Sequence, residues 1–165
     1  MIMNGPILQL YYSRLKNHNM LYLGADHRGF YLKEEIKDFL NKEKIEFVDL
    51  GNSKYDLEDD YPDFAIKVAL KVSEGKKNQG ILICGSGIGM SIVANKFKGI
   101  RAGLCLSDLI AKEAKKAIDI NILCLAADST EPAKAKLIVS QWLKANFKQE
   151  PRYLRRIKKI NELPK

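Results

Sequence analysis

Residues 80–94 read GILICGSGIGMSIVA, an apolar run that passes through a glycine-rich turn into a second apolar run. The first run, ILIC, shows no polar alternation, which is typical of a strand buried on both faces of a parallel sheet. The spacing Gly85-x-Gly87-x-Gly89 allows a tight turn directly into a helix. A strand that leads at once into a helix is the repeating unit of α/β folds.

The same alternation of short β-rich runs and longer amphipathic runs extends from Met20 to about residue 143. Predicted strands are LYLGAD (21–26), IEFVDLG (45–51), GILICG (80–85), IRAGLCL (100–106) and ILCLAA (122–127). Apolar residues at helical spacing lie between and after them: Phe30, Leu32, Ile36, Phe39 and Leu40; Phe64, Val68 and Val72; Leu137, Ile138, Trp142 and Leu143. Ser107 is expected to cap the helix after the fourth strand, and Ser129 or Thr130 the helix after the fifth. The pattern predicts a five-stranded parallel sheet covered by helices on both faces.

The 165 residues fit one domain, and 46% apolar with 29% charged residues argues against disorder. The net charge of +8 is confined to the ends, with +2 in residues 1–19 and +6 in residues 144–165. We expect residues 1–19 to form a flexible extension, residues 20–163 to form the domain, and 151–163 to form a basic helix after Pro151. The basic tail contains no recognised nucleic-acid motif, so nucleic-acid binding is not expected.

Cys84, Cys105 and Cys124 are an odd number of thiols without a zinc-binding spacing, which fits a reducing compartment such as the cytoplasm. Residues 1–19 have no positive charge ahead of their short apolar patch, so neither a secretory signal nor a membrane anchor is expected. We also expect no metal and no cofactor.

In open parallel sheets the chemistry lies beyond the carboxyl ends of the strands. The first predicted strand ends at Asp26-His27, a carboxylate beside an imidazole, and the third ends at Cys84. The turn after Cys84 offers backbone N–H groups to an anion, and the helix that follows favours a thiolate. Each feature has a plainer interpretation: a structural turn, a small core residue and a surface histidine. Cys105 and Cys124, inside apolar strands, are interpreted as core residues, and the basic tail as either a solvated helix face or a phosphate-binding segment.

Together these residues resemble the type B ribose-5-phosphate isomerase family, which includes galactose-6-phosphate isomerase subunits. The resemblance covers about residues 20–160 and is carried by GADHRGF (24–30), DYPDFA (60–65) and GILICGSGIGMSIVANKFKGIRAGLC (80–105). It implies a Rossmann-like or flavodoxin-like three-layer α/β/α sandwich with a C-terminal helix. It also implies a homodimer, with a tetramer left open, and no nucleotide or metal.

The resemblance also implies roles for individual residues. Cys84 matches the base that moves a proton between C1 and C2 of the open sugar. Ser86 and the backbone of Gly85, Gly87, Ile88 and Gly89 match the group that holds the enediolate. Asp26 and His27 match the pair that binds substrate hydroxyl and phosphate. Arg152 and Arg156 match tail arginines that reach the phosphate in the partner subunit's site.

The sequence departs from the family pattern at several positions. Ala117 and Ile118 replace the His that opens the sugar ring and an Asn that contacts substrate; Asp128 stands where many members have a phosphate-binding Arg, and Tyr153 where a His is usual. Asp26, Asp119, a water or spontaneous opening are candidates for the ring-opening step. We therefore expect an aldose–ketose isomerase of carbohydrate metabolism, acting on ribose 5-phosphate and ribulose 5-phosphate in the pentose phosphate pathway. The alternatives are another phosphorylated sugar and a non-catalytic sugar-phosphate-binding paralogue.

Overall fold

A computed structural model describes residues 19–164. Its centre is a five-stranded, fully parallel sheet in the order β2-β1-β3-β5-β4. The strands are β1 (Leu21–Ala25), β2 (Phe47–Asp49), β3 (Gln79–Cys84), β4 (Ala102–Leu104) and β5 (Ile122–Ala126). The predicted strands are confirmed, although the two edge strands, β2 and β4, are shorter than their apolar runs. The predicted extension, residues 1–19, lies outside the described residues except for Asn19.

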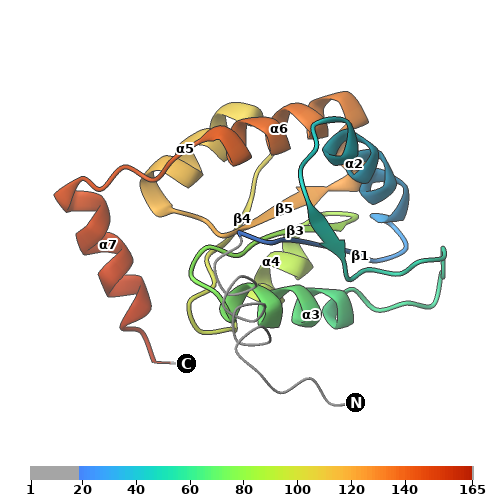
Figure 1. The fold of residues 1–165 in the computed structure, drawn as a ribbon. Coiled ribbons are helices and arrows are strands. Elements are labelled where there is room, and N and C mark those ends of the chain that lie inside the picture. The colour runs from blue at the N-terminus through green and yellow to red at the C-terminus, as the bar shows by residue number, and fades with distance from the viewer. Residues whose placement is uncertain (1–18, 165) are drawn as a thin grey trace, which may run out of the picture.

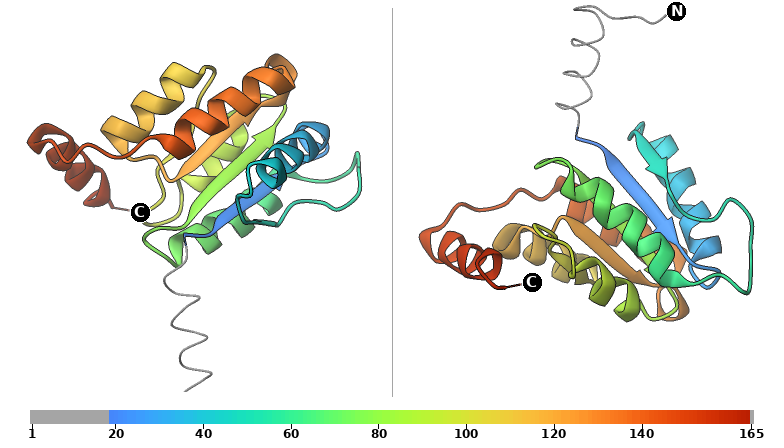
Figure 2. Two further views of the ribbon diagram at one scale, coloured as in Figure 1. Left: turned by 45° about the horizontal axis from the view of Figure 1, so that its top comes forward. Right: turned by 90° about the horizontal axis from the view of Figure 1, so that it is seen from below.

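Helices cover both faces of the sheet (Figure 1). On one face lie α2 (Phe30–Lys42), α5 (Asp108–Ile118) and α6 (Pro132–Lys144); on the other lie α3 (Tyr61–Ser73) and α4 (Ile88–Ala94). The short 3-10 helix η1 (Ala127–Ser129) precedes α6, and α7 (Pro151–Asn161) follows it. Each face of the sheet therefore has its own apolar cluster, and the expected three-layer α/β/α sandwich is confirmed (Figure 2). Within residues 19–164, no helix is long and apolar enough to cross a membrane.

The chain reverses the side of its connections between β1 and β3. From β1 the chain runs through α2 on one face of the sheet, and from β3 it runs through α4 on the other face. Because the two connections leave in opposite directions, the C-terminal ends of these neighbouring strands form a topological switch point, where α/β proteins bind ligands.

Helix α6 departs from the sequence-based expectation in two ways. Its N-cap is Glu131, without a side-chain capping bond, and neither Ser129 nor Thr130 caps it. The turn η1 takes up Ser129, and Pro132 occupies the first turn, where its missing N–H costs nothing. Leu137 is 59% exposed instead of facing the core, because Ala135, Ile138, Val139 and Trp142 form the buried face. By contrast, Ser107 caps α5 as expected, accepting a hydrogen bond from the Ile110 N–H.

Lys33 is a core residue that the apolar pattern of α2 did not predict. Its side chain is fully buried, and its ammonium donates to Asp49 at 2.6 Å and to the Asn52 carbonyl at 2.9 Å. A buried cation is tolerated when it is paired and hydrogen-bonded in this way. Lys33 thereby ties α2 to the chain that follows β2.

Candidate active site

The ends of β1 and β3 bring the two predicted halves of the site together. The strands pair in register up to Ala25 opposite Ile83, and the Asp26 N–H donates to the Ile83 carbonyl at 3.3 Å. Asp26 and Cys84 therefore each follow a paired position on neighbouring strands, which lie about 5 Å apart in a sheet. The sequence placed these residues at strand ends; the structure shows that the two ends are adjacent.

Cys84 lies inside the glycine turn. Its side chain is buried, and its Sγ accepts a hydrogen bond from the Gly87 N–H at 3.2 Å. Gly87 has a φ of +70°, in the left-handed region that favours glycine, so this turn suits a glycine at the position whose N–H bonds the sulfur. The next N–H, of Ile88, bonds the Ser86 hydroxyl at 3.3 Å. The turn thus directs one backbone N–H at the thiol and another at the neighbouring Ser86 hydroxyl, and such donors stabilise a developing negative charge.

The other two cysteines have a different environment. Cys105 and Cys124 are buried, and burial raises the pKa of the Cys105 thiol to about 11 and that of Cys124 further. Cys124 sits in the middle of β5 as predicted, whereas Cys105 follows the last residue of β4 instead of lying inside the strand, because this edge strand is short. Their interpretation as core residues agrees with this burial.

Asp26 and His27 are held by different partners. Asp26 is 4% exposed and accepts a hydrogen bond from the Gly29 N–H at 2.9 Å, and burial raises its pKa. His27 lies against Asp59, which comes from the loop ahead of α3: both the His27 N–H and its Nδ1 are 2.8 Å from Asp59 Oδ1. The hydrogen bond to Asp59 raises the pKa of His27.

Two charged residues lie beside the turn: Arg28, to which sequence reasoning gave no role, and Asp128, which it named only as a departure from the family pattern. Arg28 forms an ion pair with Asp128, and the Asp128 N–H donates to the Gly85 carbonyl at 3.0 Å. A Cβ on Gly85 would lie 2.5 Å from Arg28 Nε, so the guanidinium rests directly on the glycine turn. The pair borders a cavity of about 440 Å³. Arg28 lies within the motif GADHRGF, but only the fold reveals that Asp128, a hundred residues away, holds it there.

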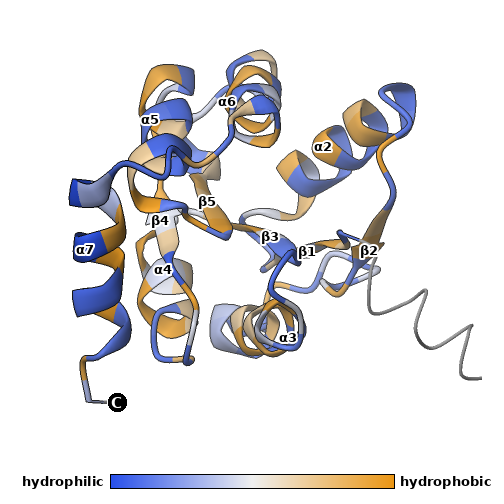
Figure 3. Cartoon of the chain, turned by 60° about the vertical axis from the view of Figure 1, so that its left-hand side comes forward, coloured by the Kyte–Doolittle hydropathy of each residue, from blue (hydrophilic) through white to orange (hydrophobic). Residues whose placement is uncertain are grey.

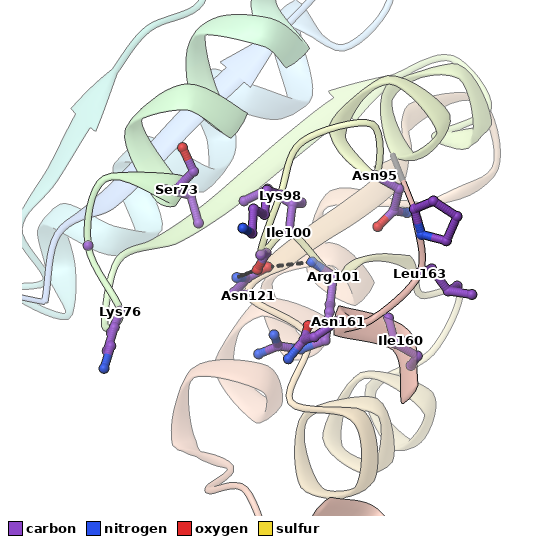
Figure 4. Close-up of a pocket in the computed structure, with 14 residues that line it drawn as sticks. Ser73, Lys76, Asn95, Lys98, Ile100, Arg101, Asn121, Ile160, Asn161 and Leu163 are labelled. Atoms are coloured by element: carbon purple, nitrogen blue, oxygen red, sulfur yellow. Dashed lines mark hydrogen bonds between the residues drawn. The ribbon is translucent and has the colours of Figure 1, made fainter. Parts of the chain in front are cut away.

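The predicted tail arginines are not near Cys84 in the same chain. Helix α7 contacts α5 and stands on the side away from the C-terminal ends of β1 and β3 (Figures 1 and 2). Its last residues, Ile160 and Asn161, line a cavity of about 770 Å³ together with Arg101 and Asn121, which precede β4 and β5 (Figure 4). Arg152 pairs with Glu150 at 2.9 Å. The structure therefore brings Asp26, His27, Cys84, Ser86 and the glycine turn together, and leaves Arg152 and Arg156 apart.

Asp119 also lies at the edge where the strands begin. It ends α5 with a φ of +51°, and its carboxylate binds Arg101 at 2.9 Å and Lys115 at 2.5 Å. With both oxygens paired at the opposite edge of the sheet, Asp119 has no route to a sugar next to Cys84 of its own chain. Among residues 19–164, no group of three or more His, Cys, Asp or Glu side chains is arranged to hold a metal ion.

Comparison with known proteins agrees with this arrangement. A family model described as Ribose/Galactose Isomerase matches residues 21–160. The chain belongs to the ribose/galactose isomerase family. One relative, "Probable ribose-5-phosphate isomerase B" of Mycoplasma genitalium, is 42% identical over 85% of this chain and 92% of its own length.

Two members of the ribose/galactose isomerase family bear on the substrate. The crystal structure of ribose-5-phosphate isomerase B from Mycoplasma genitalium with bound ribulose-5-phosphate matches with a TM-score of 0.82 and 41% identity, over 86% of this chain and 93% of that one. A "D-erythrulose-4-phosphate isomerase" of Pectobacterium atrosepticum is 38% identical over 76% of this chain and 82% of its own length. Members of the family thus carry names with both five-carbon and four-carbon sugar phosphates.

Proposed function

We propose that this protein is an aldose–ketose isomerase that interconverts ribose 5-phosphate and ribulose 5-phosphate. The observation that carries the proposal is Cys84, whose Sγ lies 3.2 Å from the Gly87 nitrogen within the glycine turn and beside Asp26. A thiolate there would be a base that accepts a hydrogen bond from the Gly87 N–H. Family membership and the relative with bound ribulose-5-phosphate support this choice of substrate.

In the proposed reaction, the Cys84 thiolate removes the proton from C2 of the open aldose. The electron pair moves through C1–C2, so that negative charge develops on O1, where the Ser86 hydroxyl and the N–H groups of the turn hold it. A proton then passes from O2 to O1, and the Cys84 thiol returns its proton to C1, which gives the ketose. The thiol ends in its starting state, so no cofactor is consumed.

The same proposal extends to a homodimer in which α7 completes the partner's site. Two observations support it. Arg152 and Arg156 lie on a helix that is remote from Cys84 of their own chain, and α7 carries an apolar stripe beside its basic one (Figure 3). Leu154 and Ile160 of this stripe are 46% and 43% exposed. Further exposed apolar residues lie on α4 and at the start of α5, next to the edge strand β4: Ile88, Ile92, Leu106, Leu109 and Ile110.

A related substrate is the second candidate, because the relative named D-erythrulose-4-phosphate isomerase shares the family and 38% identity. A non-catalytic sugar-phosphate-binding paralogue would instead keep the fold and lose the chemistry. Participation in the pentose phosphate pathway and location in the cytoplasm stay predictions from the sequence.

One experiment tests all three functions. The purified protein is incubated with ribose 5-phosphate, with a six-carbon aldose 6-phosphate and with erythrose 4-phosphate, and ketose formation is followed against Cys84→Ala as a control. Ketose from ribose 5-phosphate at the highest kcat/KM is the expected result. A higher kcat/KM on another sugar would favour the second candidate, and binding without turnover would indicate the paralogue.

A further inference from the structure

Asp59 is almost fully enclosed, and both of its carboxylate oxygens are committed. Its side chain is 8% exposed. Oδ1 accepts hydrogen bonds from the backbone N–H and the ring Nδ1 of His27, each at 2.8 Å, and Oδ2 accepts from the Asn52 amide. One carboxylate therefore fixes both the backbone and the ring of His27.

The loop that carries Asp59 is anchored to the core through Lys33. The buried Lys33 ammonium donates to the carbonyl of Asn52, whose side chain in turn holds Asp59. This chain of contacts links α2, the end of β2, the loop ahead of α3 and the end of β1. Because the network starts from a buried, paired cation, it restricts where Asp59 and His27 can move.

The geometry also decides which nitrogen of His27 is free. A carboxylate only accepts hydrogen bonds, so Nδ1 carries a proton toward Asp59, and within residues 19–164 Nε2 has no hydrogen-bond partner. The negative charges of Asp59 and Asp26 favour the doubly protonated ring, and the ring of Tyr55 lies edge-on at 6.3 Å between centroids. Protonated in this way, His27 has a cationic N–H donor at Nε2, on a residue that directly follows Asp26 at the end of β1.

We propose that Asp59 is a positioning residue: it orients His27, which the family resemblance assigns to the substrate phosphate, and it favours the imidazolium form, whose Nε2–H donates to that phosphate. This inference rests on the proposed function. Under this inference, one positive charge for the phosphate comes from His27 and Asp59 of the same chain, independently of the tail arginines. The competing interpretation is that Asp59 merely tethers the loop to the end of β1.

The substitution Asp59→Asn separates these roles, because the negative charge is lost while the amide oxygen can still accept from His27. The new NH2 group meets the Asn52 side chain, whose unpaired Oδ1 can accept from it once that amide turns over. The His27 pKa is measured by NMR titration of ring-labelled protein, with His27→Gln used to distinguish its signals from those of His18. We expect Asp59→Asn to lower the His27 pKa by about one unit. The control is Asp63→Asn, which makes the same charge change at an exposed position in the first turn of α3. It should leave the His27 pKa unchanged.

The kinetic consequence has a defined direction. A raised pKa keeps the imidazolium present to higher pH, so that phosphate binding weakens as pH rises through the pKa of His27. In Asp59→Asn this loss begins at lower pH. We expect its KM to exceed that of the wild type about five-fold or more near pH 7.5 and to approach it near pH 6, with kcat within about two-fold. The phosphate of the substrate also titrates in this pH range, but it affects both enzymes equally. Its effect therefore cancels in the ratio of the variant KM to the wild-type KM.

Two results would overturn the inference: an unchanged His27 pKa in Asp59→Asn, or a lowered pKa with a KM ratio that does not vary with pH. The pKa of His27 is also measured with and without inorganic phosphate, and binding should raise it in the wild type and less in Asp59→Asn. This readout needs no turnover. If the wild type isomerised no sugar phosphate and phosphate still raised the His27 pKa, the proposed function would fail while the role of Asp59 in anion binding stood.

Discussion

The three cysteines show how one residue type takes different roles from its surroundings. Cys105 and Cys124 are packed among apolar side chains, where burial disfavours the thiolate and raises the pKa. Cys84 is also buried, but it ends its strand and meets the Gly87 N–H. The hydrogen bond from the Gly87 N–H in the glycine turn, rather than burial, therefore distinguishes the proposed base.

Replacing each cysteine by alanine should separate catalysis from packing. Cys84→Ala should abolish isomerisation, because no other group occupies its place in the turn, and circular dichroism should show an unchanged fold. Cys105→Ala and Cys124→Ala should retain activity and lower the free energy of unfolding by about 1–2 kcal/mol, as expected for small losses of core volume. Turnover in Cys84→Ala at the wild-type rate would show that the base is misassigned.

Arg28 is expected to contribute to phosphate binding, since its guanidinium rests on Gly85 and its pairing with Asp128 uses one terminal nitrogen, Nη2. Arg28→Ala should raise KM about ten-fold with kcat little changed, as for a charge-assisted hydrogen bond to a phosphate. Lys136→Ala is the matched control, because Lys136 pairs at 2.6 Å with Glu35 on the border of the same cavity. Equal KM values for Arg28→Ala and the control would show that Arg28 does not bind the substrate phosphate.

At the scale of elements, the glycine turn is the feature that ties local conformation to chemistry. Gly87 needs a φ of +70°, and a Cβ there would lie 2.6 Å from Leu104 Cδ1 and 3.0 Å from the Leu125 carbonyl. The positive φ and the lack of space for a Cβ both apply to the residue whose N–H bonds Cys84. A side chain at position 87 would therefore move the donor away from the sulfur.

Gly87→Ala should lower kcat more than about a hundred-fold and the free energy of unfolding by about 2 kcal/mol. Gly99→Ala provides a control with a similar backbone cost, because Gly99 has a φ of +79° and a Cβ at this position would meet no atom within 4 Å. The control should lose about 1 kcal/mol of stability and keep its activity. Loss of activity in both variants to the same extent would mean that stability, not donor placement, explains the effect.

Elements were predictable where the apolar period was strong and less so at their ends. Burial on both faces of the sheet makes the runs ILIC and ILCLA continuously apolar. Burial of one face gives α2 and α3 their apolar spacing, and both patterns can be recognised in a single sequence. The prediction that Leu137 faces the core was wrong, because α6 packs against the sheet through a neighbouring face. The predicted cap of α6 was also wrong, because Ser129 belongs to the turn η1. Lys33 was missed because its partners, Asp49 and Asn52, come from another element.

At the scale of the whole molecule, the order β2-β1-β3-β5-β4 decides which strand ends meet. The sequence identified Asp26-His27 and Cys84 as strand-end residues, but their adjacency depends on β1 pairing with β3 across a crossover. The contact between Arg28 and Asp128 has the same origin. Residues held by long-range pairing are the part of the site that a motif does not reveal.

The positions Ala117 and Ile118 give a prediction about ring opening. They end α5 at the edge where the strands begin, on the same side as α7, so a dimer that brings the partner's α7 to Cys84 would bring this segment too. Without an acid–base residue there, the rate on ribose 5-phosphate should reach a ceiling set by spontaneous ring opening as enzyme is added, while erythrose 4-phosphate, which cannot close its ring, should show none. The double variant Ala117→His with Ile118→Asn should raise the ceiling for the five-carbon sugar. No ceiling and equal efficiency on both sugars would show that another group opens the ring.

The placement of α7 makes the dimer itself testable through mixed subunits. If Arg152 and Arg156 act in the partner's site, two variants should each be inactive alone. The first carries both Arg152→Ala and Arg156→Ala, and the second carries Cys84→Ala. In a hybrid dimer one site receives Cys84 from the first variant and both arginines from the second, and the other site receives neither. Random exchange of equal amounts makes half of the dimers hybrids, so activity should return to about a quarter of the wild-type level. Arg155→Ala, an exposed arginine on the same helix, should be active without mixing. With subunit exchange verified by mass spectrometry, an absence of rescue would show that the tail acts within its own chain or has no part in the reaction.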